Sequence, residues 1–298
     1  MEVIIEKPDR KDSAELTGRD SGKAGPGARP QRDLYIYLLK GLVPEKDECG
    51  LGDAFVGNWV EDDNSFLFFG RSADKVVDTL LEMHSELELI ETHHFTYDQW
   101  QGGGLKPVRV DDFVIVPSWE KMEPGEGCIQ IVLDPGVVFG NGLHPTTRGC
   151  LRAIARARRQ RPFERVLDLG TGTGVLSLAA ALLGAETVLA VDLNPLCVKT
   201  TIENVRLNGL HKIIRVVAGA VGDFVNEPAD LVVANIQYDV IQELIDRRAF
   251  HNKDRLIISG LMRSQSRGVK TRLEREHFQI LREWDHDMTW FTFLAVKG

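Results

Sequence analysis

The sequence predicts an α/β fold: a mostly parallel sheet whose strands alternate with helices and which ends in an antiparallel hairpin, preceded by a smaller α+β domain. Alternating apolar runs and stretches of helical length predict the sheet, with strands at 165–169, 187–191, 213–217, 230–235 and 255–260. Two further apolar runs, 278–284 and 289–298, lie close enough in sequence to pair as the hairpin.

The smaller domain is predicted from the residues that come before this alternation. Strands are expected at 33–41, 64–70 and 87–95, with a helix over 72–85. Strand, strand, helix, strand within about 65 residues is typical of a ferredoxin-like domain. A glycine-rich stretch, 101–107, marks a boundary. We therefore expect four segments: a disordered tail, an α+β domain, a linker and the main α/β domain, at 1–32, 33–100, 101–115 and 116–298.

Composition and charge exclude several classes of protein. A hydrophobic fraction of 43% with 27% charged residues is that of a globular protein, and no apolar run approaches the roughly 20 residues that span a bilayer. The net charge of −8 argues against direct nucleic-acid binding and favours a basic partner. The four cysteines are scattered, without a zinc-type pair or a disulfide framework. We expect a cytoplasmic protein without membrane contact or a metal site.

A glycine-rich turn follows the first predicted strand of the parallel sheet. Gly170, Gly172 and Gly174 occupy alternate positions between that strand and the next helix, where missing side chains let a ligand approach the backbone. A dinucleotide fingerprint has the order Gly-x-Gly-x-x-Gly, but here Val175 stands at the last position. The spacing therefore disfavours a nicotinamide dehydrogenase.

Two acidic residues indicate which ligand this turn binds. Asp168 stands two residues before Gly170, where a carboxylate suits a cationic ligand better than a phosphate. Asp192 ends the next strand, about 20 residues after Gly170, where an acidic residue can bind ribose hydroxyls. S-adenosylmethionine has a sulfonium, an ammonium and a ribose, so we expect it as the cofactor. The pattern resembles the Rossmann-like fold of class I methyltransferases.

Two more polar residues are expected at the same edge of the sheet. Asn235 ends the fourth parallel strand, where its side-chain oxygen can orient a methyl-accepting amine; it also suits a simple strand-end turn. Thr147 follows His144-Pro145 at a predicted helix start, where a hydroxyl and free amides can bind a carboxylate or merely cap the helix. Tyr238 lies near Asn235 as an aromatic wall or a packed core residue.

Together these segments resemble the PrmA family of ribosomal protein methyltransferases. The resemblance is carried by LDPGVVFGNGLHPTT, VLDLGTGTG, VDLNP, VVANI and LIISGL, with YDQW, KPVRV and IVPSWE before them. It implies an enzyme that transfers methyl groups from S-adenosylmethionine to lysine or amino-terminal amines of a large-subunit ribosomal protein. It also implies substrate recognition by the domain at 33–100, and cofactor contacts at Thr147, Gly170, Asp192 and Asn235.

The chain departs from the family pattern at two places. Asn141 and Leu143 replace two threonines of the loop before His144, and Gln237-Tyr238 replace the usual Leu-Ala after Asn235-Ile236. The second change alters the wall beside the acceptor. Three alternatives stay open: another protein lysine as acceptor, a small-molecule or nucleobase amine, and a cofactor-binding module without catalysis.

Overall fold

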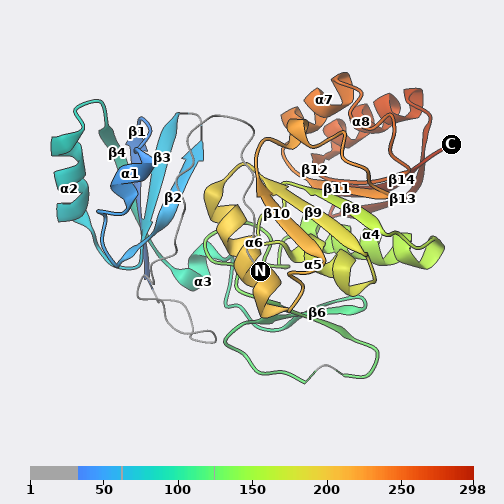
Figure 1. Ribbon diagram of the computed structural model, residues 1–298, viewed down its shortest axis with the longest axis horizontal. Helices are drawn as coiled ribbons and strands as arrows, with labels where there is room; N and C mark the ends of the chain where they lie inside the picture. The colour runs from blue at the N-terminus through green and yellow to red at the C-terminus, as the bar shows by residue number, and fades with distance from the viewer. Residues whose placement is uncertain (1–32, 62, 124) are drawn as a thin grey trace. The chain divides into compact units, whose positions relative to one another are not determined.

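The computed structural model describes residues 33–61, 63–123 and 125–298, and the predicted tail at 1–32 lies outside them. The described chain forms two compact units, residues 33–105 and 106–298. Among the described residues, the first unit has one sheet and one hydrophobic core, and the second has two sheets and two core clusters. The two units are therefore described separately (Figure 1).

The first unit has the strand order of a ferredoxin-like domain. Its antiparallel sheet runs β2-β3-β1-β4, the order of a split βαβ pair. Its elements are β1 (Asp33–Lys40), α1 (Glu45–Glu48), β2 (Phe55–Glu61), β3 (Asn64–Phe69), α2 (Asp74–Met83), β4 (Glu88–Thr96) and α3 (Tyr97–Trp100). The strand β2 and the short helix α1 are additions to the predicted elements, because neither segment has a clear apolar period.

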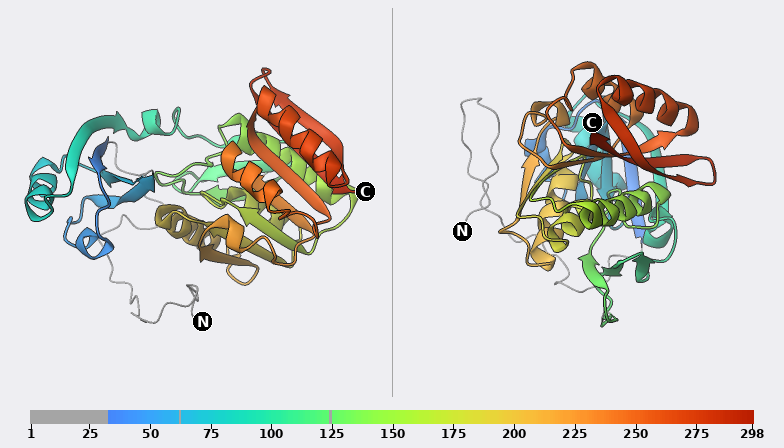
Figure 2. Two further views of the ribbon diagram at one scale, coloured as in Figure 1. Left: turned by 90° about the horizontal axis from the view of Figure 1, so that it is seen from above. Right: turned by 90° about the vertical axis from the view of Figure 1, so that its right-hand side faces the viewer.

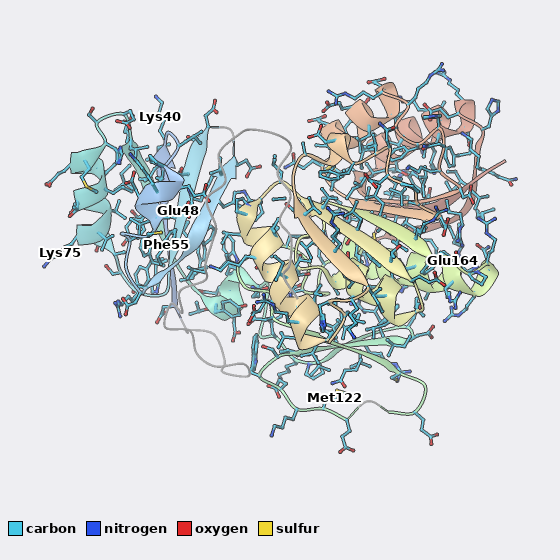
Figure 3. The ribbon with its side chains drawn as sticks, viewed as in Figure 1. Lys40, Glu48, Phe55, Lys75, Met122 and Glu164 are labelled. Carbon is cyan, nitrogen blue, oxygen red and sulfur yellow. The ribbon has the colours of Figure 1, made fainter. Side chains whose placement is uncertain are left out.

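The core of the first unit lies where α2 packs on one face of its sheet. Leu80 of α2 is fully buried beside Tyr37 and Phe69 of neighbouring strands. Phe55, labelled in Figure 3, packs against Phe69 with ring centroids 5.4 Å apart. Because alternate residues of a strand face the same side of the sheet, Tyr37 and Phe69 point toward the side that α2 covers.

The second unit contains the predicted mixed sheet of seven strands. The order is β10-β9-β8-β11-β12-β14-β13, with parallel pairing from β10 to β12 and antiparallel pairing beyond. Its strands are β8 (Arg165–Leu169), β9 (Thr187–Asp192), β10 (Ile214–Ala218), β11 (Leu231–Asn235), β12 (Arg255–Met262), β13 (Phe278–His286) and β14 (Trp290–Lys297). The order reverses between β8 and β11, which places the ligand crevice at the carboxyl ends of these strands.

Helices cover the two faces of this sheet unequally. One face packs against α4 (Pro145–Gln160), α5 (Val175–Leu182) and α6 (Pro195–Leu207). The other packs against α7 (Tyr238–Asp246) and α8 (Arg263–Arg275), and Figure 2 shows α8 lying along the C-terminal hairpin. The connection between β10 and β11 has only a 3-10 turn, η1 (Val221–Asp223).

A third, three-stranded sheet precedes the mixed sheet. It consists of β5 (Val108–Val110), β6 (Phe113–Pro117) and β7 (Ile129–Leu133). Asn208, just after α6, holds β7 by hydrogen bonds with both the N–H and the carbonyl of Val132. β5 and the start of β6 fall in the range that the sequence analysis assigns to a linker, so regular structure begins before that range ends.

Candidate active site

The glycine turn after β8 has almost no room for side chains. Gly170, Gly172 and Gly174 all have positive φ, at 73°, 58° and 83°, which residues with a Cβ rarely adopt. A Cβ on Gly170 would overlap the side chain of Ile236, and one on Gly172 would lie 2.5 Å from the carbonyl oxygen of Phe139. Three separate chain segments therefore meet at this turn.

Asp168 is buried beneath the turn and is only partly used in building it. One carboxylate oxygen accepts hydrogen bonds from the hydroxyls of Thr171 (2.8 Å) and Ser177 (2.6 Å). The other oxygen, Oδ1, is buried without a hydrogen-bond partner among the described residues. Burial raises the pKa of Asp168 to about 6, although the bonds from Ser177 and Thr171 lower it. An unpartnered buried carboxylate oxygen suits a cationic ligand.

Asp192, at the end of β9, is tied to the same turn. Its carboxylate accepts hydrogen bonds from the backbone N–H groups of Gly172 (2.9 Å) and Asn194 (3.0 Å). Burial raises its pKa, while these two backbone bonds lower it. Each carboxylate oxygen keeps a lone pair beyond these bonds, so the group can still accept a ligand hydroxyl.

Thr147 lies in the first turn of α4, which begins at the end of the loop formed by residues 137–144. Its hydroxyl is buried and has no hydrogen-bond partner among the described residues. The hydroxyl of the preceding Thr146 is instead 2.8 Å from Nδ1 of His144, which caps the helix. The amide of Thr146 donates to Nδ1 of His144, and that of Arg148 donates to the carbonyl of His144. The hydroxyl and N–H of Thr147 are therefore the groups at this helix start that can bind an anion.

The loop of residues 137–144 rests directly on the glycine turn. The backbone N–H of Thr173 donates to the carbonyl of Phe139 (3.1 Å), and its hydroxyl donates to the carbonyl of Gly140 (2.8 Å). Asn141, one departure from the family pattern, closes this loop by accepting a hydrogen bond from the N–H of Leu143. Its side chain is thus used within the loop.

Asn235 lies at the end of β11, beside the glycine turn. It is half-buried, and its side chain forms no hydrogen bond with another residue in the described part of the chain. The next residue, Ile236, packs against Gly170, and a Cβ on Gly260 would lie 3.5 Å from Oδ1 of Asn235. Tyr238 packs against the core formed with α7 and α8, as a packed tyrosine rather than a wall of the crevice.

Three aromatic rings lie side by side near this crevice. The ring of His144 contacts Phe139 at 5.0 Å and Trp290 at 5.2 Å between centroids, both edge-on. Phe139 is 47% exposed, so part of the group faces solvent. Burial and the nearby His286 lower the pKa of His144, which favours an uncharged ring at neutral pH.

The sequence pattern does not single out the residues of α6 that hold the glycine turn in place. Asn204 of α6 donates hydrogen bonds to the carbonyls of Asp134 and Thr173, and Thr201 donates to the carbonyl of Gly172. Both are fully buried. Their only sequence signal is polar character on the inward face of a helix, which a solvent-facing residue also has.

The family pattern matches most of the chain. The family model described as "Ribosomal protein L11 methyltransferase (PrmA)" matches residues 60–298. The chain belongs to this family. Among curated relatives, ribosomal protein L11 methyltransferases of Geobacillus kaustophilus and Anoxybacillus flavithermus are 40% and 38% identical over 195 and 198 residues. In both cases the match covers 64% of this chain and 62% of the relative, so the chain spans less than two thirds of these relatives' length.

A solved structure supports the same fold. The ribosomal protein L11 methylase of Lactobacillus delbrueckii subsp. bulgaricus superposes with a TM-score of 0.57 at 30% identity, covering 65% of this chain and all of that one. The predicted class I methyltransferase fold, Rossmann-like with a terminal antiparallel hairpin, is confirmed. Among the residues that the structure describes, no helix is long and apolar enough to cross a membrane, and no cluster of His, Cys, Asp or Glu could hold a metal ion.

Proposed function

We propose that this chain transfers methyl groups from S-adenosylmethionine to amino groups of a ribosomal protein. The observation that carries the proposal is the pair of buried, unpartnered atoms around the glycine turn, Oγ1 of Thr147 and Oδ1 of Asp168. Water, an ion or a ligand usually completes such atoms, and these two are singled out because Asp168 lies at the carboxyl end of β8 and Thr147 follows the loop that rests on the glycine turn. One atom is a neutral hydroxyl and the other belongs to an acid, as a ligand with both an anionic and a cationic group requires.

The residues present fit S-adenosylmethionine. The hydroxyl and N–H of Thr147 at the start of α4 would bind its carboxylate, and the open oxygen of Asp168 would face its ammonium. Asp192 would accept hydrogen bonds from the ribose hydroxyls. Gly170, Gly172 and Gly174 leave the backbone bare where the ligand lies against it. The cofactor supplies an electrophilic methyl group on a sulfonium.

Asn235 would orient the accepting amine. A lysine has a pKa of about 10.4, so roughly one amine in a thousand or fewer is neutral at pH 7, and the site must favour that form. The free side-chain oxygen of Asn235 can accept a hydrogen bond from the amine without adding an anion that would keep it protonated. The rate then comes largely from alignment of amine and methyl group.

The aromatic group of Phe139, His144 and Trp290 would form the wall along which the alkyl chain of the acceptor lies. An uncharged His144 suits this role, because a charged imidazole would repel both a sulfonium and an ammonium. Aromatic edges and faces also shield the reacting groups from water. This wall is neutral and apolar, whereas the cofactor side of the crevice is polar.

The relatives' name suggests ribosomal protein L11 as the substrate. A methyl-transfer assay with L11 as the acceptor tests the proposal. Purified chain, labelled S-adenosylmethionine and L11 should give label in L11 and an intact-mass gain of about 14 Da per methyl group. A parallel reaction with whole-cell lysate distinguishes the alternatives. Label in another protein points to another lysine, label in RNA or small molecules to a different amine, and no label to a module without catalysis.

Replacing Asn235 separates catalysis from cofactor binding. Asn235→Ala should lower the transfer rate about 100-fold, because the amine loses its acceptor, while cofactor affinity changes less than about threefold. Asn252→Ala, at an exposed asparagine in the turn before β12, serves as the matched control and should leave both values unchanged. Equal losses of rate and affinity in Asn235→Ala would refute the acceptor role.

A further inference from the structure

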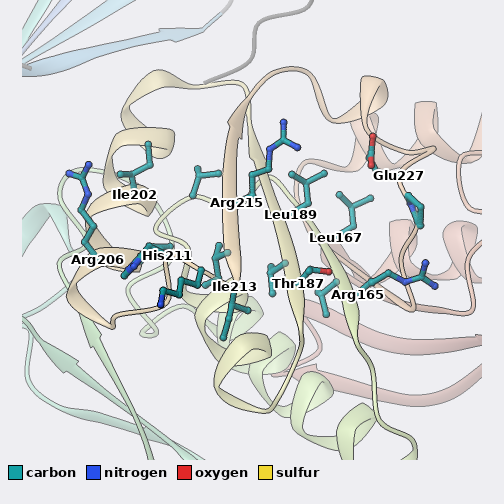
Figure 4. Close-up of a pocket in the computed structure, with 17 residues that line it drawn as sticks. Arg165, Leu167, Thr187, Leu189, Ile202, Arg206, His211, Ile213, Arg215 and Glu227 are labelled. Carbon is teal, nitrogen blue, oxygen red and sulfur yellow. The ribbon is translucent and has the colours of Figure 1, made fainter. Parts of the chain in front are cut away.

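A groove that includes no residue of the glycine turn lies along the edge of the seven-stranded sheet. Its volume is about 900 Å³, within the range of roughly 300–1,000 Å³ of ligand-binding clefts. Figure 4 shows its lining side chains coming from β8, β9, β10 and α6. Apolar side chains form much of the lining: Leu167 and Leu189 lie on the face that α7 and α8 cover farther along, whereas Ile202 and Ile213 pack on the face of α6.

The groove exists because one face of the sheet is incompletely covered. The connection between β10 and β11 has η1 alone, whereas α7 and α8 cover the same face farther along. As a result Leu189 of β9 is only half-buried, and its face neighbours Thr187 and Arg215 are exposed. An uncovered apolar sheet face favours a partner that removes it from water.

The strand β10 adds an open edge to this groove. Within the described residues it pairs with β9 alone and ends the sheet. The bond from the N–H of Val188 to the carbonyl of Ile213 sets the register, so the backbone groups of Val216 point away from β9. Proteins usually cover such an edge, because it can pair with another segment.

Basic side chains surround the apolar lining. Arg165, Arg206, Lys212 and Arg215 line the groove against a single acid, Glu227. Arg165 is paired with Asp230 and Arg206 with Glu203, yet the side chains of both arginines are more than half exposed. This basic lining contrasts with the net charge of −8 of the whole chain. The occupant should therefore be apolar and acidic.

We propose that residues 2–6 of this chain, which lie outside the described part, bind in this groove beside the open edge of β10. Their sequence is Glu-Val-Ile-Ile-Glu: three β-branched apolar residues between two acids. No other run of three apolar residues occurs before residue 33. The apolar side chains would cover Leu189 and its neighbours, and Glu2 and Glu6 would lie among the basic groups.

The intervening chain is long enough to reach the groove. Residues 7–32 can extend over roughly 85 Å, whereas a compact unit of this size is only about 40 Å across. The segment can therefore reach any face of the second unit, wherever the first unit lies.

Amide hydrogen exchange in β10 tests the proposal. Deleting residues 2–6 should speed exchange of the outward-facing amides of β10, such as that of Val216, at least tenfold. Deleting residues 14–18, a segment of equal length, is the matched control and should change nothing. A peptide with the sequence of residues 1–8 should restore protection when added to the first deletion variant. The same peptide with Glu2→Lys and Glu6→Lys should not restore it.

Three results would overturn the proposal. One is equal exchange in the full chain and in the chain without residues 2–6. Another is loss of protection in both deletion variants, which would show a general effect of shortening. A third is protection that increases with protein concentration, because a second copy would then supply the occupant. None of these readouts depends on methyl transfer, so the proposed function can fail or hold independently.

Discussion

The carboxyl ends of β8 and β9 and the groove beside β10 belong to one sheet but are built in opposite ways. At the carboxyl ends, backbone carbonyls and carboxylates approach so closely that even a methyl group does not fit at Gly172. At the groove, side chains of ordinary size leave about 900 Å³ open. Backbone geometry therefore determines the surface at the carboxyl ends, whereas the groove results from the absence of a helix between β10 and β11.

Two glycines provide the sharpest test of this difference. Gly172→Ala should cost about 2–5 kcal/mol of folding free energy, because it combines left-handed strain with a clash against the carbonyl of Phe139. Cofactor affinity should fall at least about 100-fold, since the turn must shift. Thermal unfolding and calorimetric titration measure the two effects.

The control is Gly209, in the loop between α6 and β10. Its φ of 68° is also left-handed, but a Cβ there would meet nothing within 4 Å. Gly209→Ala should cost only the strain, about 1–2 kcal/mol, and leave cofactor affinity unchanged. Equal costs at the two glycines would mean that the close contact with the carbonyl of Phe139 adds nothing to the cost at Gly172.

The sequence predicts the backbone-determined surface well. Apolar runs in the sequence predict strands that end near Asp168, Asp192 and Asn235, as observed. The alternate glycines predict a turn with unusual backbone angles, and each of them has a positive φ. These signals are local: each depends on a few consecutive residues. The mixed sheet and its terminal hairpin could therefore be predicted, with strand boundaries close to those observed.

Contacts between distant segments could not be predicted in the same way. Asn204 holds Asp134, 70 residues away in sequence, and no pattern around either residue indicates that contact. The groove is likewise the result of a connection between β10 and β11 that has too little regular structure to cover the sheet, and its lining residues come from five segments. Tertiary contacts of this kind depend on topology, which single-residue preferences do not encode.

The buried acid at the carboxyl ends should make cofactor binding depend on pH. Burial holds the pKa of Asp168 at about 6 in the free protein, so lowering the pH from 7.5 to 5.0 protonates it and removes the charge that we propose to face the ligand's ammonium. Affinity should fall about tenfold over this range. Calorimetric titration at a series of pH values measures the effect.

Two variants assign that dependence to its source. Asp168→Asn should bind more weakly at pH 7.5 and lose the change centred near pH 6, even though the variant keeps the ionisable groups of Asp192 and His144. Asp230→Asn is the control, because Asp230 pairs with Arg165 of the groove and lies outside the glycine turn. Burial raises the pKa of Asp230, but hydrogen bonds from Arg165 and Glu164 outweigh it and lower the pKa. Its replacement should leave the pH profile of binding unaltered; a profile that persists in Asp168→Asn would contradict the assignment.

Thr146 and Thr147 give the smallest and most selective test, because adjacent hydroxyls have opposite environments. The Thr146 hydroxyl bonds to His144, whereas that of Thr147 is buried without a partner among the described residues. Thr147→Val removes an unsatisfied group, so it should stabilise the free protein by up to about 1 kcal/mol while weakening cofactor binding about fivefold. Thr146→Val should instead destabilise the fold by about 1 kcal/mol. If Thr147→Val lowered stability and left affinity intact, the hydroxyl would serve the fold, and the carboxyl ends would hold no atom reserved for a ligand's carboxylate.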